Sequence, residues 1–180
     1  APLECVNLLS AVRTTAVTLA NNHIMDHGLQ GLNSTIAALE KNGILYFGAG
    51  PNEHSAYQPV IIEKKGIRIG LIGFGEHEGG GATRTVPGAA VLDIIEFTRS
   101  VEEHKSKFDY LIVFFHGGNE HLSIPRPSLV KLCRFLVDQG ADAVFCQHSH
   151  CVGCYEKYKD RHIVYGQGNF LFDKHNASPE

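Results

Sequence analysis

The sequence has no long hydrophobic stretch and no excess of charge of either sign. Its longest apolar run, Tyr110 to Phe115, is far shorter than the roughly 20 residues of a membrane-spanning helix. Sixteen Lys and Arg residues stand against 19 Asp and Glu residues, for a net charge of -3 at pH 7. These absences exclude a membrane span within this chain, and they give no general electrostatic attraction to nucleic acid.

A secretion signal is also missing from the first residues, Ala-Pro-Leu-Glu-Cys, which form neither a basic nor an apolar segment. We therefore expect that a signal is absent or already removed, and that the chain begins inside a longer protein. The cysteines are odd in number and show no disulfide-scaffold spacing, which favours a reducing compartment. Two locations stay open: the cytoplasm, or a membrane-anchored extracytoplasmic protein with an upstream anchor. The cysteines are Cys5, Cys133, Cys146, Cys151 and Cys154.

What the sequence does have is an ordinary globular composition and many histidines. Apolar residues make up 43% and charged residues 19% of its 180 residues, which is typical of one folded domain. We therefore treat residues 1–180 as a single domain. Eleven histidines are unusually many, and several adjoin Asn, Asp, Gly or another His, which points toward metal chemistry.

Short apolar runs alternate with amphipathic stretches along the chain, and this pattern predicts an α/β domain. The run at 109–115 is continuously apolar, as in a strand buried on both faces. The expected strands are 17–20, 44–48, 60–63, 67–72, 109–115, 143–146, 155–158 and 162–165, and the expected helices are 29–39, 92–101 and 129–137. Residues 60–72 and 155–165 are each expected to form a hairpin.

Side chains able to bind metals follow three of these strands. They are Asn22 with His23, then His116, then His148 with His150. Ligands of an open α/β sheet bind outside the carboxyl ends of its strands, so we expect these residues to converge on one cleft.

His148 and His150 invite a second interpretation, because Cys151 and Cys154 follow them. In an extended segment the two histidines would point to the same face, toward one metal or two adjacent metals. A four-ligand zinc site would use the two cysteines as well, but structural zinc sites usually join two separated ligand pairs. A thioredoxin-like motif is disfavoured because no helix starts at Cys151. We expect both thiols to be unbridged and metal-free.

Four ordered motifs resemble those of the CapA family of poly-gamma-glutamate capsule synthesis proteins. The motifs are Leu19-Ala20-Asn21-Asn22-His23 with Asp26 and Gly28, His116-Gly117-Gly118-Asn119-Glu120, His148-Ser149-His150, and Gly168-Asn169-Phe170 with Phe172-Asp173. The resemblance extends from about Ala1 to Asp173. It implies a calcineurin-like metallophosphoesterase-type layered sheet sandwich (α/β/β/α), incomplete at its N-terminus.

The resemblance also implies roles and a cofactor. Asn22, His116, His148 and His150 correspond to ligands of two divalent metal ions, which are Mn, Fe, Zn or Mg. His23 corresponds to the acid that protonates the leaving group. Asp26, Glu120 and Asn169 occupy supporting positions.

Several departures from the family pattern stand beside these matches. Cys146-Gln147 replaces the usual Gly-His before the closing pair, and Gly117 occupies a position that is commonly aromatic. The family's first strand, which ends in a metal-binding Gly-Asp, and a later Asn-Leu-Glu element are absent from the sequence. We therefore expect this chain to hold two metals poorly, because neutral ligands supply little of the required negative charge.

Two hypotheses for function follow from the resemblance. In the first, the protein is a metal-dependent phosphoesterase that serves capsule or exopolysaccharide production. In the second, it is a non-catalytic assembly or transport component that binds an anionic polymer in the same cleft. Both hypotheses imply capsule biosynthesis machinery as the partner and exclude nucleic acid.

Overall fold

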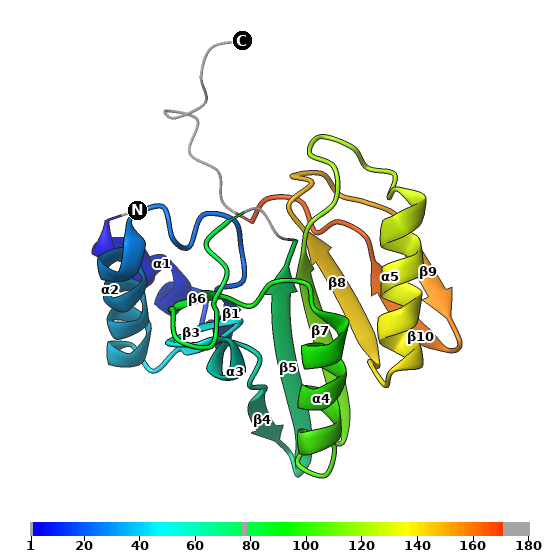
Figure 1. The fold of residues 1–180 in the computed structure, drawn as a ribbon, viewed down its shortest axis with the longest axis horizontal. Coiled ribbons are helices and arrows are strands. Elements are labelled where there is room, and N and C mark those ends of the chain that lie inside the picture. The colour runs from blue at the N-terminus through cyan, green and yellow to red at the C-terminus, as the bar shows by residue number, and fades with distance from the viewer. Residues whose placement is uncertain (1, 77–78, 171–180) are drawn as a thin grey trace.

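The computed structural model describes residues 2–76 and 79–170, and a six-stranded mixed sheet lies at its centre (Figure 1). In spatial order the strands are β4 (Val60–Lys64), β5 (Ile67–Gly75), β7 (Tyr110–His116), β8 (Ala143–Gln147), β10 (Arg161–Val164) and β9 (Tyr155–Tyr158). The four inner strands run parallel, whereas β4 and β9 pair antiparallel at the edges. The carboxyl ends of β5, β7 and β8 therefore meet at one edge of the sheet.

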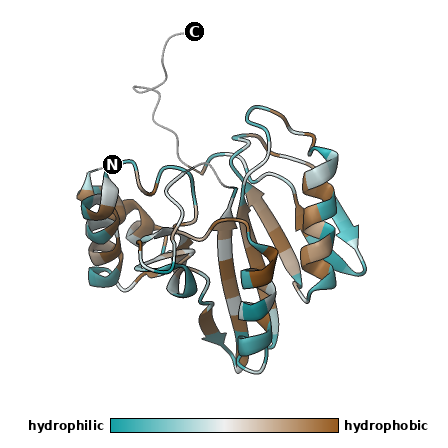
Figure 2. Ribbon diagram, in the orientation of Figure 1, coloured by the Kyte–Doolittle hydropathy of each residue, from teal (hydrophilic) through white to brown (hydrophobic). Residues whose placement is uncertain are grey.

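Helices α4 (Ile94–His104) and α5 (Pro127–Asp138) cover one face of this sheet. The alternation along β7 sends Leu111, Val113 and Phe115 toward these helices, where all three are fully buried. Figure 2 shows the apolar colouring concentrated along β5, β7 and β8. α4 begins where the carboxylate of Asp93 accepts hydrogen bonds from the N–H groups of Ile95 and Glu96.

The other face of the sheet carries a second, smaller layer. β1 (Ala16–Thr18) pairs in parallel with β2 (Leu45–Phe47), and the ring of Phe47 lies 5.5 Å from that of Phe114 on β7. The layers pack so closely at Gly73 that an added Cβ there would lie 2.5 Å from Thr18 Oγ1. A further short pair consists of β3 (Ala49–Gly50) and β6 (Gly88–Ala89).

Helix α2 (Gly28–Lys41) covers this second layer with Leu32 and Leu39, which are both buried. The order of layers is therefore helix, sheet, sheet, helix, and it confirms the α/β/β/α sandwich that the sequence led us to expect. Within residues 2–76 and 79–170 the second sheet consists of two-stranded pairs. No helix of the described chain is both long and apolar enough to cross a membrane.

The longer helices and strands match the sequence predictions closely, whereas the shortest ones were not predicted. In α5, Leu129 and Leu136 are buried, and Lys131 and Arg134 are exposed. The strand expected at 17–20 ends at Thr18, because a turn begins where the N–H of Asn21 bonds the carbonyl of Leu19. The sequence analysis missed β3, β6, η1 (Leu3–Cys5), α1 (Val6–Ala11) and α3 (Glu53–Ala56), which are too short to show a clear hydrophobic period.

Candidate functional site

The candidate site lies at the carboxyl ends of β7 and β8, beside the loop that follows β1. His116 ends β7 and shares a face with Phe114, so its ring points toward the β1–β2 layer. Its Nε2 lies 3.1 Å from the Oδ1 of Asn22, to which it donates a hydrogen bond. Two residues that are 94 positions apart in the sequence are thereby joined across the two sheets.

His148 and His150 come to the same place from the loop after β8. The ring of His148 lies 4.9 Å from the ring of His116 and 6.5 Å from the ring of His150, measured between centroids. These distances confirm that the three histidines converge. The expectation of an extended segment was wrong, however, because His148 and His150 have φ angles of 97° and 56°. The chain turns here through two left-handed residues, and buried Ser149 between them accepts a hydrogen bond from the N–H of His121.

Each of the three predicted supporting residues contacts a different histidine. His23 Nδ1 donates to Asp26 Oδ2 over 2.8 Å, and His150 Nδ1 donates to Asn169 Oδ1 over 2.8 Å. The carboxylate of Glu120 lies 3.8 Å from His148 Nε2. The two hydrogen-bonded partners, Asp26 and Asn169, fix the orientation and tautomer of their imidazole rings, so that the other ring nitrogen can face a ligand.

The electrostatics of the site keep His116 neutral. Burial, together with the smaller electrostatic effect of the neighbouring His148, His23 and His150, lowers its pKa from 6.5 to about 4. A histidine must be neutral to bind a metal ion, so the site presents His116 in the form that ligation requires at neutral pH.

The donor set fits part of a divalent metal site. Imidazole nitrogens and an amide oxygen are ordinary ligands of zinc, manganese and iron, and here they come from three separate segments. Within residues 2–76 and 79–170, however, no three or more His, Cys, Asp and Glu side chains are grouped so that they could hold a metal ion. The individual ligand roles of Asn22, His116, His148 and His150 therefore remain predictions.

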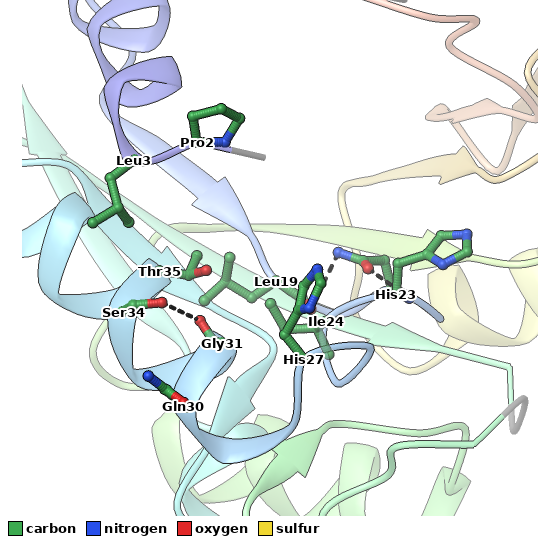
Figure 3. Close-up of a pocket in the computed structure, with 11 residues that line it drawn as sticks. Pro2, Leu3, Leu19, His23, Ile24, His27, Gln30, Gly31, Ser34 and Thr35 are labelled. Atoms are coloured by element: carbon green, nitrogen blue, oxygen red, sulfur yellow. Dashed lines mark hydrogen bonds between the residues drawn. The ribbon is translucent and has the colours of Figure 1, made fainter. Parts of the chain in front are cut away.

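A pocket of about 780 Å³ opens beside His23 (Figure 3). Figure 3 shows its walls: the loop with His23 and His27, the helix α2 with Ser34 and Thr35, and the N-terminal Leu3. None of the described residues that line it is Lys, Arg, Asp or Glu. The lining residues are Pro2, Leu3, Leu19, Asn21, His23, Ile24, His27, Gln30, Gly31, Ser34 and Thr35.

Two residues beside the site were not anticipated from the sequence. Glu76 directly follows β5, and its carboxylate accepts a hydrogen bond from the N–H of Gly118 over 3.0 Å. The ring of His121 stacks 5.9 Å from that of His150. The signal for Glu76 was present, because it follows an apolar strand just as His116 does. The expected strand stopped at residue 72, three residues short of the end of β5.

All five cysteines carry free thiols. Cys151 is half-buried and Cys154 is exposed, where its Sγ donates to the carbonyl of Ser123 over 3.5 Å. Cys133 on α5 and Cys146 on β8 are fully buried, with their sulfur atoms 3.5 Å apart. This contact with Cys133, and then burial, raise the pKa of the Cys146 thiol, which keeps it protonated and unreactive.

The family model described as bacterial capsule synthesis protein PGA_cap matches residues 1–174. The chain belongs to this capsule-synthesis family. The capsule biosynthesis protein CapA of Bacillus anthracis is 31% identical over 95% of this chain and 43% of its own length. The PGA biosynthesis protein CapA of Bacillus subtilis is 32% identical over 95% of this chain and 46% of its own length. This member of the family thus spans a little under half of these relatives.

Solved structures place this capsule-synthesis chain in the metallophosphoesterase fold. A 5'-nucleotidase precursor from Thermus thermophilus aligns with a TM-score of 0.60 at 18% identity, over 91% of this chain and 31% of that one. The NAD nucleotidase of Haemophilus influenzae aligns with a TM-score of 0.56 at 14% identity, over 88% of this chain and 31% of that one. At these identities the likeness establishes the fold.

Proposed function

We propose that this chain supplies the histidine and asparagine ligands of a dinuclear metal site, with which the complete protein hydrolyses a phosphoester during capsule synthesis. The supporting observation is the meeting of Asn22, His116 and His148, which come from three distant segments and two different sheets. A purely structural role would not require three side chains with metal-binding atoms to gather at the edge where α/β sheets bind their ligands.

Bound divalent ions would supply Lewis-acid polarisation of the phosphoryl group. His116, His148, His150 and Asn22 would hold them. His23 would donate a proton to the leaving oxygen, and Asp26 orients the His23 ring through their 2.8 Å hydrogen bond. The exposed position of His23 lets its ring reach a substrate outside the ligand cluster.

The pocket beside His23 is where we place the leaving part of the substrate. It shares His23 as a wall, so a group lying there would have its ester oxygen next to the proposed acid. The described residues of its lining combine aliphatic side chains with imidazole, amide and hydroxyl groups. These groups suit a polar, uncharged portion of a substrate better than a cationic one.

One observation favours a second candidate function. Among the described residues, no three His, Cys, Asp or Glu side chains lie close enough together to hold a metal ion. A capsule component that keeps the fold and binds an anionic polymer, without catalysis, would need no complete metal site.

The test uses the full-length protein that contains this chain, supplied with manganese and an aryl phosphodiester or monoester. We expect metal-dependent hydrolysis that Asn22→Ala abolishes. Asn33→Ala, which changes an exposed asparagine on α2, serves as the matched control and should retain the wild-type rate. Tight metal binding without hydrolysis would favour the non-catalytic candidate, and full activity in Asn22→Ala would refute the ligand assignment.

A further inference from the structure

Glu76 is tied to His116 by the backbone as well as by its side chain. Gly75, the last residue of β5, is the register partner of His116 on β7. Directly after it, the N–H of Glu76 donates to the carbonyl of His116 over 2.9 Å. The start of the Glu76 segment therefore sets the position of the His116 peptide.

The carboxylate of Glu76 holds the next turn of the chain. Its Oε2 accepts the N–H of Gly118 over 3.0 Å, and its Oε1 pairs with the guanidinium of Arg126. Both oxygens are thus engaged, so the carboxylate is not directed at the histidine cluster as a metal ligand. The side chain is only 20% exposed, which strengthens both contacts relative to a surface pair.

Gly117 leaves the space that this carboxylate occupies. A Cβ at position 117 would lie 2.5 Å from Glu76 Cγ and 2.8 Å from a ring carbon of Phe115. Gly117 does not have a left-handed φ, so the need for glycine is one of room and not of backbone conformation. An aromatic residue, which is common at this position in the capsule-synthesis family, would clash with the Glu76 side chain where it lies here.

We infer that Glu76 is a positioning residue, which fixes the turn after β7 and through it the direction of the His116 ring, and that Gly117 accompanies it. The inference deepens the proposed function, since it rests on His116 being a metal ligand. It also gives a physical reason for the glycine at position 117, where the family commonly has an aromatic residue: the absence of a side chain leaves room for the Glu76 carboxylate.

A simple stabilising ion pair is the competing explanation. Within the part of the chain that the structure describes, the buried Nε of Arg126 has no hydrogen-bond partner, so this arginine is incompletely satisfied in the pair. A pair that acts only on stability would, when broken, lower the unfolding free energy without moving His116. A positioning pair would change the environment of the His116 ring in a protein that remains folded.

The experiment records the imidazole NMR signals of His116 in the metal-free chain, for Glu76→Ala and Glu76→Gln. We expect Glu76→Ala to shift these signals. Glu76→Gln should shift them less, because its amide oxygen can still accept the Gly118 N–H. Glu156→Gln is the matched control, since it breaks the ion pair with Arg134 at a glutamate that is 21% exposed. It should leave the His116 signals in place.

Metal affinity in the full-length protein provides the second measurement. Loss of a group that orients a ligand typically weakens metal binding by about 10- to 100-fold, and we expect that loss for Glu76→Ala. Unchanged His116 signals in folded Glu76→Ala would overturn the positioning role. Shifted signals in a protein that binds no divalent metal even as wild type would support the positioning role and refute the proposed function instead.

A double-mutant cycle tests the partnership with Gly117. Gly117→Ala should disturb His116 by pushing the Glu76 side chain off the Gly118 N–H. Adding Glu76→Ala removes the atoms that clash, so the two effects should combine to less than their sum. Additive effects would show that Gly117 serves the Phe115 contact and not Glu76.

Discussion

The molecule has two hydrophobic cores of different size, and the candidate site lies between them. Among the described residues, the large core has twenty buried members and lies mainly between the six-stranded sheet and helices α4 and α5. The small core has five, which pack α2 against the segments that flank β1 and β2. Half-buried His116 lies at the end of β7, which belongs to the large core. Exposed His23 lies in the loop after β1, beside the small core. We propose a division of labour, in which the large core positions the proposed histidine ligands, while the smaller layer carries the proposed acid His23 and one further proposed ligand, Asn22.

Replacing one histidine from each side gives the largest expected difference. His116→Ala in the full-length protein should lower metal occupancy. His23→Ala should leave occupancy nearly unchanged and reduce turnover by roughly 10²- to 10⁴-fold, the usual contribution of a general acid. Metal analysis and phosphoesterase rates on the same samples measure both effects. Equal metal loss in the two variants would make His23 a ligand.

Large-to-small substitutions should separate the two cores energetically. Leu136 in the large core and Leu32 in the small core are both buried. Leu136→Ala should cost about 2–5 kcal/mol, and Leu32→Ala should lie near the lower end of that range, because a small core can collapse into the space. Urea unfolding measures the costs. In hydrogen exchange, Leu32→Ala should loosen the segment around Asn22 and leave β7 protected, and protection lost equally in both places would show a single cooperative core.

The pH dependence of stability should report the environment of His116. Its folded pKa of about 4 lies below the ordinary 6.5, so the unfolded chain binds more protons between these values. Stability of the metal-free chain should therefore be fully present above pH 6.5 and fall as the pH drops toward 4. Urea unfolding across this range measures the slope, which His116→Gln should reduce. An identical slope in that variant would assign the effect to other groups.

The smallest expected effect concerns the helices that flank the two cores. Asp93 caps α4 with two hydrogen bonds, whereas His27 at the start of α2 makes no side-chain capping bond. Asp93→Ala should cost about 1 kcal/mol. His27→Ala should change stability by less than about 0.5 kcal/mol. Thermal unfolding of both variants tests the contrast, and a larger cost at His27 would reverse it.

The sequence alone identified the histidines and the strands that carry them. Hydrophobic periodicity and strand ends depend on neighbouring residues in the sequence. The strand at 109–115 and the position of His116 at its end were therefore predictable from the residues themselves. The three supporting residues came from the resemblance, and the structure pairs each with one histidine.

Only the tertiary structure decided which residues from distant segments meet, and by what backbone geometry. His148 and His150 form a left-handed turn and not the expected extended segment. The residue types in this segment do not by themselves determine its backbone φ angles. Glu76 became visible as a partner of Gly118 and Arg126 only once β5 and β7 lay side by side. Contacts between such segments depend on how sheets stack and register, and a single sequence does not record that arrangement.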